Sequence, residues 1–243
     1  MRKFLLAATA AVTLAAPAQA ADMSVKARPA AVVAAAYNWT GFYVGLVGGG
    51  GWADTRHTNN INGANSGTVG ISGGLLGGTY GYNAQFGSWV LGVEGDFSWS
   101  GIKGSFNDTG SGFCVGVVQC ETSLRWFGTN RARLGYAADR LFIYGTAGVA
   151  YGNVSGFLTN VTPPPTFVAG NNTRAAFVYG AGVEWGFAPA WSVKAEYLRT
   201  DLGDQATYGT TALPLLERVS LKNLDIVRVG VNYRFGGPLV ARY

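Results

Sequence analysis

The sequence predicts an all-β fold, specifically an eight-stranded antiparallel up-and-down transmembrane β-barrel. Apolar residues make up 48% of the chain and charged residues only 13%, which is apolar for a secreted protein. Beyond the N-terminal segment, however, no apolar run approaches the roughly 20 residues of a membrane-spanning helix. The apolar residues instead alternate with polar ones, and this period of two is typical of strands with two different faces. Short and long connections also alternate, as they do in outer-membrane barrels.

Five segments alternate clearly. In residues 89–100, Trp89, Leu91 and Val93 share one face, while Glu94 and Asp96 share the other. The same contrast recurs in the segments 123–136, 174–187, 191–197 and 227–235. Three further segments alternate with weaker contrast, namely 40–52, the glycine-rich 69–83 and 141–151. The total of eight is an even number, as expected for a single-chain bacterial barrel.

The connections and the aromatic residues indicate which face meets lipid. Short links are expected at about 85–88, 137–140 and 188–190, and long loops at about 53–68, 101–120, 152–173 and 202–222. A soluble barrel would show the same alternation with its apolar face inward. Aromatic residues on the apolar face, however, gather near both ends of the strands, as in the interfacial girdles of membrane barrels. They are Trp52, Trp99, Trp126 and Tyr151 near one rim, and Phe42, Trp89, Tyr136, Phe187, Trp191, Tyr233 and Phe235 near the other.

The N-terminus predicts export. Arg2 and Lys3 precede an apolar stretch, and the small residues Ala18 and Ala20 form a cleavage pattern, so residues 1–20 are expected to be a cleaved signal peptide. We then expect a periplasmic linker over 21–38, the outer-membrane barrel over 39–235 and a short tail over 236–243. The predicted location is the cell outer membrane.

The charge balance and the motifs exclude several functions. Loss of Arg2 and Lys3 leaves 16 basic against 13 acidic residues, which is too mild and too scattered for a nucleic-acid partner. The Gly48–Gly51 run lacks the strand-turn-helix context of a nucleotide site. No cofactor or metal spacing is apparent, and we expect no catalytic residues. His57, the one histidine, is interpreted as a solvated loop residue, although Asp54 and Ser66 nearby leave open a lipid-modifying enzyme.

The polar face is predicted to fill the lumen with paired charges. An eight-stranded barrel has an interior just wide enough for side chains, and charges placed there must pair. Glu94 and Asp96 are expected beside Arg131 and Arg133 on the next strand. Two further pairs are expected across neighbouring strands, Glu184 with Lys194 and Glu196 with Arg228. The alternative is that these residues line a selective pore.

Two loop features complete the candidate sites. Cys114 and Cys120 lie close together in one predicted outer loop, and an exported protein experiences an oxidising environment, so we expect a disulfide between them. Pro163–Pro165 is expected to stiffen the third long loop into an extended segment. It is interpreted as a rigid exposed loop, with a binding element as the alternative.

Several motifs resemble a known family. They are Ala21-Asp22-Met23, Trp39–Gly45, Gly81–Gln85, Val93–Phe97, Arg131–Tyr136 and Val231–Phe235. In this order they resemble the small outer-membrane surface-antigen, or porin-family, proteins of alphaproteobacteria, across nearly the whole mature chain. The resemblance implies an OmpA-like transmembrane β-barrel that supports the integrity of the envelope and presents loops at the surface.

The end of the last strand predicts an assembly signal. Val231, Tyr233 and Phe235 alternate and end in an aromatic residue, which resembles the signal read by the outer-membrane assembly machinery. The chain continues past Phe235, so either Phe235 or Tyr243 is the residue that is read.

The resulting functional hypothesis is structural. We expect a barrel with a closed lumen that supports the envelope and presents antigenic or adhesive loops, and the alternative is a narrow porin-like channel for small solutes. The expected partners are outer-membrane lipid and lipopolysaccharide, the assembly machinery, and surface ligands bound through the loops.

Overall fold

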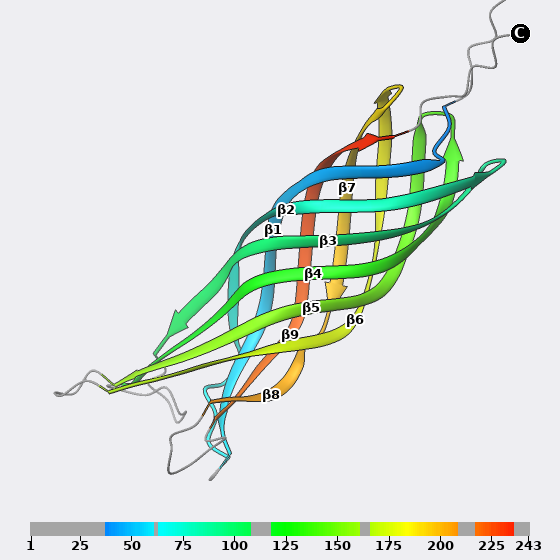
Figure 1. Cartoon of the computed structure of the whole chain (residues 1–243). Helices are drawn as coiled ribbons and strands as arrows, with labels where there is room; N and C mark the ends of the chain where they lie inside the picture. The colour runs from blue at the N-terminus through cyan, green and yellow to red at the C-terminus, as the bar shows by residue number, and fades with distance from the viewer. Residues whose placement is uncertain (1–36, 61–62, 108–117, 161–165, 209–216, 236–243) are drawn as a thin grey trace, which may run out of the picture. The chain divides into compact units, whose positions relative to one another are not determined.

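A single closed ring of β-strands dominates the molecule (Figure 1). The computed structural model describes residues 37–60, 63–107, 118–160, 166–208 and 217–235. The strands are β1 Gly41–Asn59, β2 Val69–Phe86, β3 Trp89–Phe106, β4 Val118–Ala138, β5 Leu141–Asn160, β6 Thr166–Ala188, β7 Trp191–Thr200, β8 Gly203–Tyr208 and β9 Glu217–Arg234. In this part of the chain no helix is long and apolar enough to cross a membrane.

Every neighbouring pair in the ring is antiparallel, and β1 closes it by pairing with β9. Consecutive strands lie side by side, which is the up-and-down order. β7 and β8 both pair with β9, β7 through Trp191–Thr200 and β8 through Gly203–Tyr208. They are therefore two parts of one strand, interrupted at Asp201 and Leu202, and the ring has eight positions. The predicted eight-stranded antiparallel barrel is confirmed.

Two-residue turns join the strands at one end of the barrel, which we call the turn end. They connect β2 to β3, β4 to β5 and β6 to β7. Gly87 and Asp139 in two of these turns adopt positive φ angles of 63° and 50°. Tight hairpins need such φ values, and glycine and aspartate tolerate them. The opposite end, where the longer connections lie, is the loop end.

The strands reach further toward the loop end than the sequence predicted. β1 continues to Asn59 instead of ending at Trp52, and β5 continues to Asn160 instead of Tyr151. β6 begins at Thr166 instead of residue 174, and β9 begins at Glu217 instead of Val227. The expected loop boundaries were therefore wrong. The period-two contrast used to find strands weakens beyond the aromatic rim, because no lipid is present there to require an apolar outer face.

The outer wall of the ring is apolar. Leu46 is 71% exposed and Val93 is 61% exposed, although both lie in the middle part of long strands. The predicted girdle residues are also exposed at the two rims, with Trp99 at 70% and Phe42 at 66%, while Trp126 is half-buried. A continuous band of exposed apolar side chains is unusual on a soluble protein and typical of a surface that faces lipid.

β-Bulges interrupt the register close to the loop-end rim. The β3–β4 pairing shifts between Trp99 and Ile102, and the β4–β5 pairing shifts between Leu124 and Phe127. An extra residue in one strand reverses the side on which the following residues point. Leu124 is accordingly buried and Arg125 is exposed. The alternation over 123–136 predicts Leu124 on the apolar, lipid-facing side and Arg125 on the polar, lumen-facing side, and both predictions were wrong.

Candidate functional site in the barrel lumen

The inward-facing residues change in character along the barrel axis. On β3 they run from Val90 at the turn end, through Glu94 and Asp96, to Ile102 toward the loop end, and all four are buried. Buried residues of the other strands add to these levels, so the lumen contains a turn-end layer, a charged layer and a loop-end layer.

Glu94 is the centre of the charged layer. Its carboxylate accepts contacts from Arg131 Nη2 at 2.7 Å, Arg133 Nη1 at 3.1 Å and Lys194 Nζ at 2.6 Å. The hydroxyl of Tyr43 donates a further hydrogen bond of 2.8 Å. These four partners come from β1, β4 and β7, so Glu94 on β3 connects opposite walls of the lumen.

Glu196 and Asp96 form a second centre one step closer to the loop end. Arg228 contacts both carboxylates through Nη2, Glu196 at 2.7 Å and Asp96 at 2.9 Å. Arg131 also contacts both, at 2.9 Å and 3.2 Å. Thr129 donates a hydrogen bond of 2.5 Å to Asp96. Such bidentate and shared contacts are the geometry in which arginine pairs most strongly with carboxylates.

Glu184 occupies the edge of the charged layer nearest the turn end. It pairs with Arg133 Nη2 at 2.6 Å and accepts hydrogen bonds from Ser192 and Asn232. Lys194 is its register neighbour on β7, but the lysine ammonium reaches across the lumen to Glu94. The expected Glu184–Lys194 pair is thus replaced by two longer connections, whereas Glu196 and Arg228 do meet as expected.

The structure brings all eight predicted lumen residues into one connected network. Four carboxylates face four cations, and each of these residues is at most 6% exposed. The balance matters because an unpaired charge in this environment would be strongly destabilising. The members of the charged layer are Glu94, Asp96, Arg131, Arg133, Glu184, Lys194, Glu196 and Arg228.

Glycines in the wall make room for the lumen side chains. A Cβ atom on Gly81 would lie 2.4 Å from the hydroxyl of Tyr43, and one on Gly182 would lie 2.5 Å from that of Tyr144. These two tyrosines donate hydrogen bonds to Glu94 and Glu196, respectively. The glycine-rich strands therefore permit large side chains to lie flat against the opposite backbone.

Aromatic residues form the turn-end layer. Trp39 is fully buried, donates a hydrogen bond from Nε1 to the carbonyl of Asp139 and packs on Phe142. Tyr37 packs on Trp39, and the guanidinium of Arg234 lies 4.4 Å from the Tyr37 ring centre. Tyr37 falls in the predicted linker over 21–38, and Trp39 was expected only as the first residue of the barrel and of a family motif. Both residues belong to this layer because Trp39 bonds to the short turn at Asp139, 100 residues away in sequence.

The loop-end layer is apolar and was not predicted. It lies beyond the charged layer on every strand that contributes to it. Its buried residues are Ala53, Ile71, Leu75, Ile102, Cys120, Leu124, Phe127, Ala150, Val154, Val178, Leu198, Leu202, Val219, Leu221, Leu224 and Ile226. For Leu124 the cause is a β-bulge, which turns a residue that continues the apolar alternation of its strand into the lumen. Ile102 and Val178 keep the alternation of the charged residues on their strands, and the change from charged to apolar side chains along the lumen was not anticipated.

His57 is not the solvated loop residue that the sequence suggested. It lies on β1, is fully buried, and its Nε2 is 2.7 Å from Thr122 Oγ1. Thr122 also lies 3.0 Å from Thr55 Oγ1, and the His57 ring meets Phe106 edge-on. The prediction was wrong because β1 extends seven residues beyond Trp52 and carries His57 inward.

The remaining predicted features fall partly outside the described residues. Cys120 is buried in the loop-end layer, but Cys114 lies outside them, so the disulfide stays a prediction. Pro163–Pro165 and Tyr243 lie outside them as well. The predicted assembly signal is on the lipid-facing side of β9, where Val231, Tyr233 and Phe235 are exposed. Among the residues described, no group of histidine, cysteine or acidic side chains has the arrangement of a metal site.

Comparison with known proteins agrees with this architecture. Residues 4–235 match the outer membrane protein beta-barrel domain family. The 31 kDa outer-membrane immunogenic protein of Brucella melitensis is 37% identical over 97% of this chain and 100% of its own length. The 22 kDa outer membrane protein of Rhizobium leguminosarum is 33% identical over 70% of this chain and 68% of its own.

A solved structure shares the fold. The outer membrane protein OprG of Pseudomonas aeruginosa superposes with a TM-score of 0.51 at 13% identity, over 82% of this chain and 98% of that one. At this identity the likeness concerns the fold alone. The closed ring with its lipid-facing wall and the match across nearly the whole chain lead to one conclusion: this protein belongs to the outer membrane protein beta-barrel family and is located in the cell outer membrane.

Proposed function

We propose that the protein is a closed structural barrel that supports the outer membrane and presents its loop end at the cell surface. The observation that carries this proposal is the filling of the lumen at three successive levels by buried side chains. A solute would have to displace the aromatic layer, the charged layer and the apolar layer in turn. Wide aqueous channels are found in barrels of about 16 strands, not eight.

The loop-end layer is the strongest argument against a steady pore. Ile102, Leu124, Phe127, Leu221 and Leu224 are all fully buried and come from three strands. Apolar side chains that close on one another exclude water and ions, because an ion that crosses them loses its hydration without gaining a partner. A polar lumen alone would not provide this barrier.

One observation favours the alternative of a narrow channel. Within the described residues, Asp96 Oδ1, Ser98 Oγ and Arg228 Nη1 are buried without a hydrogen-bond partner. Groups of this kind are commonly satisfied by internal water. Water at the charged layer would be confined between the two other layers, so we favour the closed barrel.

The role at the cell surface rests on the strand extensions and on the relatives. β1, β5, β6 and β9 carry paired backbone past the outer aromatic rim, which provides a rigid base for the loops. The Brucella relative is named an immunogenic protein. By analogy, we propose that this chain also presents antigenic or adhesive loops, and that it acts without catalysis.

Planar-bilayer recording tests the closed barrel. The full chain, refolded in detergent and inserted into a bilayer, should give no steady conductance. Phe127→Ala and Leu221→Ala together should increase the frequency of brief openings, because each truncation leaves a cavity in the apolar barrier. Lys103→Ala, at an exposed site on β3, serves as the control.

Two results would contradict the proposal. The first is a steady wild-type conductance that changes with Glu94→Ala or Arg131→Ala, because the charged layer would then line an open path. The second is hydrolysis or acyl transfer of outer-membrane lipid by the purified protein that is lost with His57→Ala, because the protein would then be an enzyme.

A further inference from the structure

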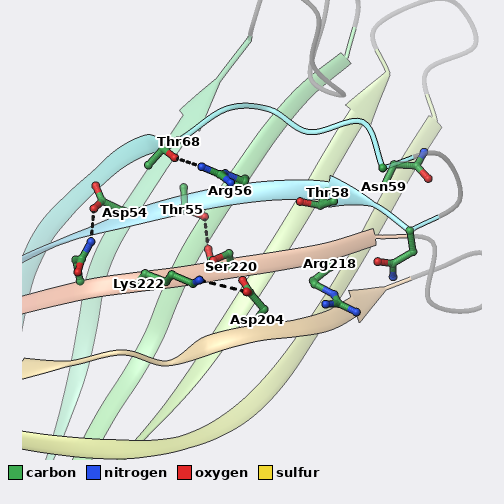
Figure 2. A pocket seen from close by; sticks show the side chains of 13 residues that line it. Asp54, Thr55, Arg56, Thr58, Asn59, Thr68, Asp204, Arg218, Ser220 and Lys222 are labelled. Carbon is green, nitrogen blue, oxygen red and sulfur yellow. Dashed lines mark hydrogen bonds and ion pairs between the residues drawn. The ribbon is translucent and has the colours of Figure 1, made fainter.

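A polar pocket of about 570 Å³ lies on the outside of the barrel near the loop end (Figure 2). Its walls come from β1, β8 and β9 and from the segment between β1 and β2. Asp54, Arg56 and Thr58 are alternate residues of β1 whose side chains are exposed or half-buried, whereas Thr55 and His57 between them are buried in the lumen. The pocket therefore opens away from the lumen and takes no part in the closure proposed above.

The carboxylates in this pocket already have partners. Asp54 accepts a hydrogen bond of 2.8 Å from Asn223, and Asp204 lies 3.4 Å from Lys222 Nζ. A hydrogen bond from Ser220, together with Lys222 and Arg218, lowers the pKa of Asp204, so this carboxylate is ionised at neutral pH and offsets the charge of Lys222. Neither acid neutralises Arg56 through a direct contact.

Two guanidinium groups are left with capacity to bind. Arg56 donates to the hydroxyl of Thr68 at 2.6 Å and makes no ion pair within the described chain. Arg218 acts on Asp204 through its charge, and in Figure 2 no dashed line joins its side chain to the other residues drawn. Arg218 is the register partner of Thr58, so the two arginines lie on neighbouring positions of one paired surface. Arginine presents the planar donor fork that suits phosphate and carboxylate groups.

The position of the pocket indicates where its ligand comes from. Trp52, a residue of the outer aromatic rim, is 49% exposed and lies four positions before Arg56 on the same strand. At about 3.3 Å per residue, Arg56 lies at most roughly 13 Å beyond that rim. The polar headgroup zone of a bilayer extends about 5–8 Å beyond the hydrocarbon on each side, and saccharide headgroups extend further. The pocket thus faces the level of the headgroups and the first sugars.

We propose that this pocket binds the anionic saccharide headgroup of an outer-leaflet glycolipid. Arg56 and Arg218 contact its phosphate or carboxylate groups, and Asp54, Thr68 and Asn223 contact sugar hydroxyls. The mixture of charged, hydroxyl and amide groups in one concave site suits a ligand that carries both anionic groups and hydroxyls. The proposal goes beyond the closed barrel and does not depend on it.

The test measures glycolipid retention by the full chain in phosphatidylethanolamine nanodiscs. Kdo2-lipid A, a glycolipid with two phosphates and two carboxylated sugars, is titrated in, and native mass spectrometry counts the copies that remain bound. Arg56→Gln with Arg218→Gln should weaken apparent binding about tenfold or more, because two charge-assisted contacts are lost. Arg125→Gln, an exposed arginine on β4 outside the pocket, should leave binding unchanged.

A second variant tests the same pocket independently, so that misfolding of the first does not decide the result. Thr58→Glu places a carboxylate opposite Arg218 and should also weaken binding of Kdo2-lipid A. The mobility difference between boiled and unboiled samples on a denaturing gel verifies that each variant has folded. The deacylated oligosaccharide of the same glycolipid should bind more weakly than Kdo2-lipid A, because it lacks the membrane-embedded part.

Three outcomes would overturn the proposal. Equal retention by the wild type and by both pocket variants would show that the pocket is not the site. An equal loss with Arg125→Gln would assign binding to general surface charge. Equal or tighter binding of the deacylated oligosaccharide would assign the pocket to a soluble anionic glycan instead of the membrane. None of these results bears on the conductance test.

Discussion

The charged layer and the loop-end layer occupy the same lumen with opposite chemistry. The charged layer holds four acids and four bases in mutual contact across the ring, whereas the loop-end layer is built from apolar side chains. Charges in a buried network depend on every partner, because removal of one leaves the others uncompensated. Apolar packing depends mainly on volume, and it tolerates a change of shape if the volume is kept. The two layers should therefore respond differently to substitution.

The largest effect is expected from Glu94→Ala. It removes the carboxylate that contacts Arg131, Arg133 and Lys194, and it leaves an excess of positive charge in the lumen. We expect the free energy of unfolding to fall by about 3–5 kcal/mol. Equilibrium unfolding in urea from lipid vesicles, followed by tryptophan fluorescence, measures it. Lys103→Ala, at an exposed site on β3, should change stability by less than about 0.5 kcal/mol.

Leu221→Ala tests the loop-end layer in the same assay. Leu221 is fully buried, so truncation creates a cavity and should cost about 2–5 kcal/mol. Leu221→Met nearly conserves the volume and should cost less than about 1.5 kcal/mol. A methionine variant as damaging as the alanine variant would contradict the idea that this layer depends on volume alone.

A double-mutant cycle sharpens the contrast. Lys194 Nζ lies 2.6 Å from Glu94, so Glu94→Gln combined with Lys194→Met removes one acid and one base together and keeps the charge balanced. The double variant should be more stable than the sum of the single variants predicts, with a coupling of about 0.5–3 kcal/mol. Additive losses would mean that charge balance does not control this layer. The same cycle at Leu221 and Val178, two apolar positions, provides the comparison.

The smallest effect is expected at the polar cluster beside the loop-end layer. His57→Gln keeps a polar group near Thr122 but loses the ring contact with Phe106. We expect a loss of about 0.5–1.5 kcal/mol, the typical contribution of one aromatic ring pair. A loss as large as that of Glu94→Ala would place His57 among the groups on which the lumen depends, as the charged layer does.

The face on which each side chain lies was predicted correctly where apolar and polar residues alternate with a fixed period. Trp89, Leu91 and Val93 were placed on the lipid face and Glu94 and Asp96 in the lumen, and the structure places all five in this way. The face of a side chain can be predicted from its neighbours in sequence, because successive side chains of a strand point to opposite sides. The same rule failed at Leu124 and Arg125, beyond the β-bulge in β4, because an inserted residue reverses the faces and leaves no clear mark in the sequence.

Contacts between distant segments could not be predicted from the alternation within each strand. Trp39 and Asp139 meet across 100 residues, and His57 meets Thr122 across 65. The ion partners of Lys194 and Glu184 also differ from their register neighbours, because long side chains in a narrow lumen can reach strands beyond the adjacent one. The pocket near Arg56 and Arg218 requires β1 and β9 to be adjacent, which closure of the ring brings about.

By itself, the sequence determined the number of strands, the identity of the lipid face and the presence of balanced charges inside. These properties follow from the period of two and from the cost of exposing polar groups to lipid, and both act on each strand separately. Only the tertiary structure decided which acid meets which base, which residues form the layers above and below the charges, and how far the strands extend past the membrane. Those features depend on ring closure and on β-bulges, which bring together residues that no local pattern connects.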